Sequence, residues 1–128
     1  MTRTLVLGAV AVVLLSGCKS KEQGVREHFA KDFTCPEKRI EVRERTDLKP
    51  SNWSKETPPP AEIAADPERL KMWQAKRDEQ RGYEDSSDTI FEARGCDHQK
   101  LYACHRHNKD PNYIMCSSRD YPANAEKW

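Results

Sequence analysis

Cysteine and histidine side chains crowd into residues 96–116, near the end of the chain. They are Cys96, His98, Cys104, His105, His107 and Cys116. Zinc accepts sulfur and nitrogen ligands of this kind in a tetrahedral arrangement, and His105 and His107 point to the same face if both lie on one strand. The stretch lacks the paired CxxC spacing that is typical of zinc knuckles. A metal site is therefore one open interpretation, and disulfide bonds are the other.

Patterns that would indicate an enzyme are absent from the sequence. It contains no GxSxG, HExxH, Walker loop or redox CxxC pattern, and after residue 17 only Gly24, Gly82 and Gly95 remain, too few for a phosphate-binding loop. The acidic and basic residues are spread singly, which is typical of a solvated surface. We expect no catalytic residues and no enzymatic activity of the chain itself, although an accessory subunit of an envelope enzyme is a third interpretation.

The start of the chain, residues 1–17, has the composition of an export signal. Arg3 supplies one positive charge, and an uninterrupted apolar run follows at residues 5–15 (LVLGAVAVVLL). A helix needs about 20 apolar residues to cross a bilayer, and this run is much shorter. It therefore predicts a cleaved leader over residues 1–17 and not a membrane span.

A four-residue pattern follows the apolar run: Leu15, Ser16, Gly17 and Cys18. It resembles the lipobox of bacterial lipoproteins, which implies that Cys18 carries a diacylglycerol thioether and an N-acyl chain. Several acyl chains give stable anchoring where one is marginal. Lys19, and not Asp, follows the cysteine, and the resemblance then implies the outer membrane of a Gram-negative envelope, with the domain facing the periplasm or the cell surface. We expect a lipid-anchored protein with no cofactor other than this lipid.

Four cysteines remain once Cys18 is lipidated. An even number in an exported domain of about 110 residues predicts two disulfides. If two strands pair about a turn near Asp110, Cys104 and Cys116 lie opposite each other and can bond, which leaves Cys35 for Cys96.

Periodicity and breakers divide the mature chain into elements. Residues 18–23 predict a lipidated tether, and Val25, Phe29 and Phe33 lie on one side of a helix that ends before Cys35. Residues 48–64 are rich in proline and predict an irregular loop. An N-cap at Asp66 begins a helix that we expect to reach about Arg81, with Leu70, Trp73, Ala64 and Arg77 inward. Strands are predicted at 38–44, 89–94, 100–106 and 113–117, with turns at 95–99 and 107–112, and residues 120–128 predict a loosely ordered tail apart from what Tyr121 or Trp128 touches.

This order of elements predicts a small α+β domain over residues 24–119. We expect an antiparallel sheet of three or four strands, one or two helices that cover it, and disulfides that hold it together. Val, Ile, Leu and Phe are few after the leader, and charged side chains outnumber them by more than three to one. Because so small an apolar core stabilises a fold poorly, the disulfides should matter.

The charge balance and the aromatic residues indicate which kind of partner to expect. The mature chain has 21 basic and 21 acidic side chains in no long block, so we expect no nucleic-acid partner. Its aromatic residues serve as core in so small a domain, except that Trp53 lies in the proline-rich loop. Trp53 is therefore our candidate contact residue for an unidentified envelope protein.

Two cysteine motifs resemble a known group of proteins. Residues 33–36 (FTCP) lead into a strand, residues 91–96 (FEARGC) follow, and residues 102–104 (YAC) come next. This arrangement is similar to that of small uncharacterised lipoproteins of myxobacteria, although Asp97 stands where that group often has glycine. The resemblance implies an outer-membrane lipoprotein and no activity. The sequence thus favours a structural or interaction module, with a small metal-binding protein as the alternative.

Overall fold

The computed structural model describes residues 17–128, so the predicted leader lies outside the described residues except for Gly17. The chain forms three α-helices and four strands, joined in part by two short 3-10 turns. The elements in order are α1 (Lys21–Phe33), η1 (Glu37–Arg39), β1 (Glu41–Glu44), η2 (Pro50–Trp53), α2 (Ala61–Ala64), α3 (Pro67–Ser87), β2 (Thr89–Gly95), β3 (His98–Arg106) and β4 (Ile114–Arg119). Among residues 17–128, no helix combines the length and the hydrophobicity that crossing a bilayer requires.

The four strands form one antiparallel sheet in the order β1-β2-β3-β4, which confirms the predicted α+β class. β1 is shorter than expected because residues 37–39 form η1. β2 and β3 are joined by only two residues, since Gly95 already pairs with His98. Those two, Cys96 and Asp97, have φ of 49° and 64°, which is the geometry of a tight hairpin turn. Asp97 therefore adopts the left-handed conformation that glycine would adopt most easily.

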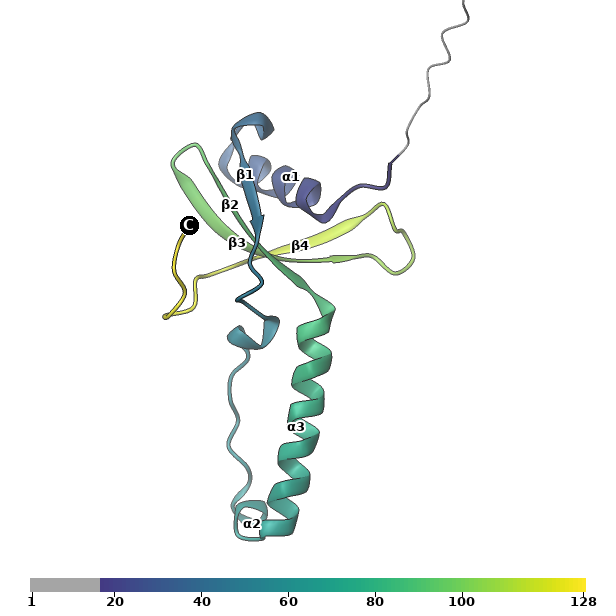
Figure 1. The fold of residues 1–128 in the computed structure, drawn as a ribbon, viewed down its shortest axis with the longest axis vertical. Helices are drawn as coiled ribbons and strands as arrows, with labels where there is room; N and C mark the ends of the chain where they lie inside the picture. The colour runs from purple at the N-terminus through teal and green to yellow at the C-terminus, as the bar shows by residue number, and fades with distance from the viewer. Residues whose placement is uncertain (1–16) are drawn as a thin grey trace, which may run out of the picture.

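Helix α1 covers one face of the sheet (Figure 1). Ser20 caps its first turn, and Val25 and Phe29 are fully buried, as their spacing predicts. A Cβ on Gly24 would come within 2.8 Å of Ile114, so only glycine lets the helix lie this close to β4. The expected tether is short, because α1 begins at Lys21 and not after residue 23.

The opposite face of the sheet is covered without a helix. Its buried residues are Leu48, Ile90, Leu101 and Ala103, and Trp53, Tyr121 and Ala125 pack against them. The cover thus comes from the segment around η2 and from residues 120–128. This tail contains neither helix nor strand, but Trp53 Nε1 donates to the Asp120 carbonyl (2.7 Å) and Arg45 donates to that of Glu126 (2.8 Å).

Both predicted disulfides are present. Cys104 and Cys116 are register partners on β3 and β4, with Cα atoms 4.2 Å apart, as a turn centred near Asp110 requires. The Cys35–Cys96 bond joins the end of α1 to the β2–β3 turn, with Cα atoms 5.9 Å apart. Cys35 and Cys104 belong to the main core cluster, and Cys96 and Cys116 pack against it. The Cys35–Cys96 bond therefore connects the end of α1 covalently to the sheet.

Residues 54–87 form an arm that extends away from the sheet (Figure 1). Its main element, α3, has 21 residues, corresponding to a length of about 30 Å, and continues six residues beyond the predicted end at Arg81. Asp66 caps α3 as expected, accepting from the amides of Glu68 and Arg69. The proline-rich stretch of residues 48–64 runs alongside α3 and contains η2 and α2. It is thus less irregular than predicted.

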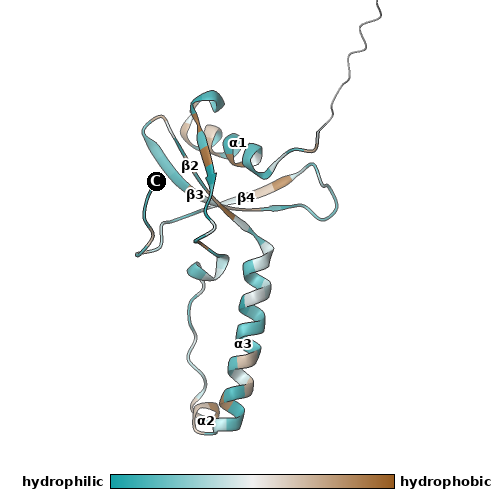
Figure 2. Ribbon diagram, in the orientation of Figure 1, coloured by the Kyte–Doolittle hydropathy of each residue, from teal (hydrophilic) through white to brown (hydrophobic). Residues whose placement is uncertain are grey.

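The expectation that α3 packs into the core is wrong. None of its residues is buried; Leu70, Trp73 and Arg77 are half-buried and Ala64 is exposed. In Figure 2 α3 is mainly hydrophilic, whereas the strongest hydrophobic colour lies on the strands, including the point where they cross. The half-buried face of α3 therefore packs on the neighbouring proline-rich segment, and α1 alone covers the sheet as a helix.

Candidate functional site

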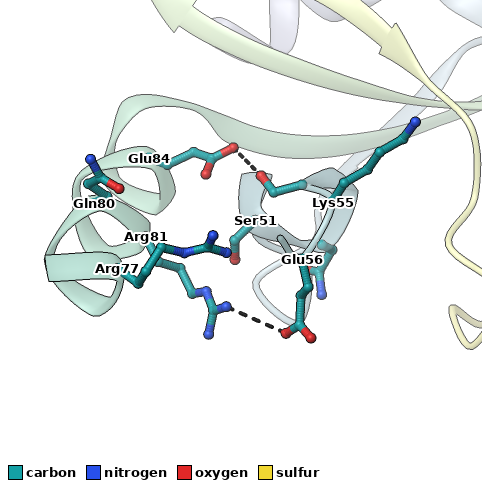
Figure 3. Close-up of a pocket in the computed structure, with 9 residues that line it drawn as sticks. Ser51, Lys55, Glu56, Arg77, Gln80, Arg81 and Glu84 are labelled. Atoms are coloured by element: carbon teal, nitrogen blue, oxygen red, sulfur yellow. Dashed lines mark hydrogen bonds and ion pairs between the residues drawn. The ribbon is translucent and has the colours of Figure 1, made fainter. Parts of the chain in front are cut away.

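A polar cleft lies at the base of the arm, between η2 with the segment after it and the last turns of α3 (Figure 3). Its volume is about 570 Å³. The lining side chains are almost all polar: Ser51, Asn52, Ser54, Lys55, Glu56, Arg77, Gln80, Arg81 and Glu84. The cleft is built by a chain reversal, so residues far apart in the sequence face each other.

Hydrogen bonds and an ion pair hold the two sides of this cleft together. The Ser54 hydroxyl donates to Glu84, and the Ser51 amide donates to Asp85 Oδ1 (2.9 Å). Arg81 Nη2 lies 3.5 Å from Glu56 Oε1 (Figure 3). These contacts join residues 51–56 to residues 81–85 across the cleft.

A second cleft of about 520 Å³ continues along the arm and shares residues with the first. Arg77 lies at the junction: its guanidinium sits 5.1 Å from the centre of the Trp73 ring and donates to the Thr57 carbonyl (3.3 Å). Together the clefts offer guanidinium groups, hydroxyls, amides and one indole. These groups suit hydrogen bonds and ion pairs with a polar partner.

A buried charge cluster lies on the sheet and not on the arm. The carboxylate of Glu92 on β2 is fully buried and accepts from Arg45, from Gln99 Nε2 (2.6 Å) and from the amide of Trp128 (2.6 Å). Arg43 lies 3.5 Å away. This cluster fixes residues 120–128 against the sheet, so its role is structural.

Arg45 links the Glu92 cluster to solvent through Asp47. Its guanidinium donates two hydrogen bonds of 2.8 Å to the Asp47 carboxylate. These bonds, with a contribution from Glu92, raise the pKa of Arg45. The same bonds lower the pKa of Asp47 to about 2.

Two tyrosines are also shifted by their surroundings. Burial, and then the hydrogen bond that Tyr102 donates to Asp32 (2.7 Å), raises the pKa of Tyr102. Burial, and then the negative charge of Glu92, raises the pKa of Tyr121. Both hydroxyls therefore stay protonated in neutral solution.

The proposed lipid attachment residue lies beside the folded domain. Cys18 is exposed and is the one free cysteine among residues 17–128. Next to it, Lys19 pairs with Glu27, and this hydrogen bond lowers the pKa of Glu27. The Lys19 carbonyl accepts from Arg106 on β3 (3.2 Å). The chain is thus attached to the domain one residue after Cys18.

The residues of the alternative metal cluster do not converge in the structure. All four core cysteines are in disulfides, and the three histidines have separate partners. His98 stacks on Phe33 with ring centres 4.3 Å apart, His105 Nδ1 lies 2.7 Å from Asp88, and His107 accepts from backbone amides in its own loop. Within residues 17–128, no group of three or more histidine, cysteine or acidic side chains is placed to hold a metal.

Trp53, the candidate contact residue, packs on the core. Trp53 is half-buried, packs against the second core cluster and donates to the Asp120 carbonyl. The premise that it lies outside the core is therefore wrong. The arm carries more exposed side chains, Met72 and Tyr83, which are 72% and 81% exposed.

Sequence reasoning missed the Glu92 cluster and the arm clefts. A strand covered on both faces is normally apolar throughout. The single charged residue in the run of residues 89–93 (TIFEA) could therefore have indicated a buried ion pair. No local pattern signals the clefts, because their two sides come from separate segments.

Three comparisons bear on relatives of this chain: protein-family models, curated proteins and solved structures. None of the three finds a match. Membership of the myxobacterial lipoprotein group therefore stays a prediction from the cysteine motifs.

Proposed function

We propose that this chain is a lipid-anchored protein of the bacterial outer membrane that acts as an interaction module through its arm. The pattern at residues 15–18 and the exposed thiol of Cys18 support the anchor. Two disulfides support an oxidising compartment, where such bonds persist.

The position of Cys18 determines how a lipid anchor would orient the domain. With Cys18 two residues from the N-cap of α1, a lipid there holds the sheet domain at the bilayer surface. The purple start of the described ribbon and α2, which marks the tip of the arm, lie far apart on opposite sides of the fold (Figure 1). The arm would therefore present its surfaces away from the anchor.

The observation that carries the interaction role is the absence of buried residues in α3. A helix in a small domain normally stabilises the fold by burying one face. Here the whole of α3 contributes no buried side chain, while two polar clefts and two exposed large side chains lie along it. Such a surface suits a protein partner, and the anchor would keep encounters near the membrane and raise the effective concentration there.

Membrane fractionation tests the anchor. We expect the full-length protein to sediment with outer membranes, to partition into detergent and to carry acyl mass on Cys18 by mass spectrometry of its N-terminal peptide. Cys18→Ser should lose the acyl mass and the detergent partition. An unmodified Cys18 in a protein that fractionates as soluble would overturn the anchor.

Removal of the arm tests the interaction role. Glu56 and Arg81 approach each other across the arm, so residues 57–80 can be replaced by a short Gly-Ser linker without stretching the base. We expect this variant to keep both disulfides and the melting temperature of the sheet domain. It should lose the crosslinks to a partner protein that the parent forms in membranes. The same crosslinks in both proteins would exclude the arm as the contact surface.

A further inference from the structure

Four residues form one line along the outer side of α3, which we call the outer stripe: Met72, Lys76, Glu79 and Tyr83. They follow one another at intervals of four, three and four positions. This is the spacing of a seam that faces a second helix, because a helix turns once in about 3.6 residues. The outer stripe therefore has the geometry of a helix-packing surface.

The outer stripe is unoccupied by other parts of the described chain. All four side chains are exposed, and Met72 and Tyr83 are the most exposed of the large hydrophobic residues. Among residues 17–128, the ion pairs include neither Lys76 nor Glu79. Leu70, Trp73 and Arg77, which are half-buried, lie on the other side of α3, so packing within the arm leaves the outer stripe free.

We infer that the outer stripe binds the outer stripe of a second copy of this chain, with the two α3 helices antiparallel. A two-fold axis between residues 77 and 78 sets Met72 against Tyr83 of the second copy, and Lys76 against its Glu79. Because the arrangement is symmetric, each of these contacts occurs twice. Methionine packs well on aromatic rings, and the charges are opposite.

Charge also selects the direction. In a parallel pair in register, Lys76 would face Lys76 and Glu79 would face Glu79, which repel. The antiparallel pair replaces both repulsions with attractions. At its ends Arg69 faces Ser86, which adds no like charge. The stripe is thus complementary to itself in one orientation only.

The inference rests on the proposed interaction role of the arm and names its partner, but it does not depend on the lipid. Two Met–Tyr contacts and two exposed ion pairs make a small interface, so the dimer is weak in solution. Attachment of both copies to membrane raises their effective concentration. The two sheet domains lie at opposite ends of the paired arms, so both lipids reach one bilayer when the paired arms lie along its surface.

Sedimentation velocity on residues 18–128 with Cys18→Ser tests the inference apart from the anchor. This chain keeps every described helix and strand and should be exported by a non-lipoprotein leader so that its disulfides form. We expect a monomer–dimer equilibrium at concentrations up to about 100 µM. A monomer throughout would overturn the inference and leave the anchor to its own test.

Charge exchange identifies the surface. Lys76→Glu should weaken the dimer about tenfold, and Lys76→Glu combined with Glu79→Lys should restore it. Lys109→Glu, in an exposed loop away from α3, is the matched control and should change nothing. Equal helicity of all variants by circular dichroism excludes misfolding. A dimer that Lys76→Glu leaves intact would place the contact elsewhere and overturn the inference.

Crosslinking of the full-length protein in membranes tests the direction. Co-expressed Met72→Cys and Tyr83→Cys chains should form a disulfide dimer with each other, whereas either variant alone should not. Peptide mapping confirms that the native disulfides remain. A disulfide between two copies of the Met72→Cys variant would indicate parallel helices and contradict the proposed pairing.

Discussion

The sheet domain (residues 19–53 and 88–128) and the arm are built on opposite principles. In the sheet domain, α1 buries Val25 and Phe29 completely, and two disulfides close the surrounding chain. In the arm, α3 is longer than α1 and buries nothing. Its order comes from local features: the Asp66 cap, a proline at the first helical position and contacts with one neighbouring segment.

Helix length and helix burial are thus independent in this chain. α1 depends on tertiary packing, so changes around it should affect the whole domain. α3 depends on its cap and on a few polar contacts, so changes in it should stay local. Four measurements test this difference.

Loss of the Cys35–Cys96 disulfide should have the largest effect. The two cysteines are 61 residues apart, so Cys35→Ala with Cys96→Ala should lower the free energy of unfolding by about 4 kcal/mol on the loop-entropy model. Denaturant titration measures the loss. The Cys104–Cys116 pair, which are 12 residues apart, should contribute about 3 kcal/mol. Unchanged stability after removal of both bonds would show that the apolar core alone supports the sheet.

Two arginines with similar chemistry should differ in the two regions. Arg45 pairs with the fully buried Glu92, and Arg45→Met should cost about 3 kcal/mol because a buried charge loses its main partner. Arg81 pairs with Glu56, which is 87% exposed, and Arg81→Met should cost less than about 1 kcal/mol. Equal costs in denaturant titration would contradict the division into a packed and an exposed region.

A proline in α3 should melt the arm and spare the sheet. Gln74→Pro removes an exposed residue and breaks the helix locally, which costs about 3 kcal/mol within the arm. We expect a clear loss of helical circular dichroism and a global stability within about 1 kcal/mol of the parent. Lys31→Pro, at an exposed position in α1, is the matched control and should unfold the domain. If Gln74→Pro also unfolds the sheet, the arm is part of the cooperative core.

Acid should reveal a small contribution from Asp47. Its pKa of about 2 in the folded chain lies below the ordinary value of 3.8, so its ionised form stabilises the fold above about pH 4, and this contribution is lost as the pH falls toward 2. Its side chain is 61% exposed, so the effect should be less than about 1 kcal/mol. Melting temperatures of the parent and Asp47→Asn should differ at pH 6 and converge at pH 2. A constant difference would mean that Asp47 acts without its charge.

Local patterns predicted the β3–β4 hairpin well, whereas the turn predicted at 95–99 consists of only Cys96 and Asp97. The turn residues near Asp110 and the alternation around Cys104 set the β3–β4 register, and with it the disulfide to Cys116. The end of α3 lies six residues beyond the expected Arg81, because a glycine such as Gly82 is tolerated inside a solvated helix. Periodicity shows that Leu70 and Trp73 share a face, but it does not show what that face packs on.

Long-range contacts account for the rest of what was missed. Arg45 and Glu92 are 47 positions apart, and no spacing rule joins them. The clefts of the arm arise where residues 51–59 pass residues 73–84, so they require the chain reversal at α2. The outer stripe, in contrast, follows from sequence spacing once α3 is known to be exposed.

The Cys35–Cys96 bond encloses the whole arm, since residues 54–87 lie between its two cysteines. A protease that cuts this exposed segment therefore cannot release either fragment. The first fragment, with Cys18, α1 and β1, stays bonded to the second, with β2, β3 and β4. The chain can lose the integrity of its most accessible segment and remain one molecule, until a reductant opens the disulfide.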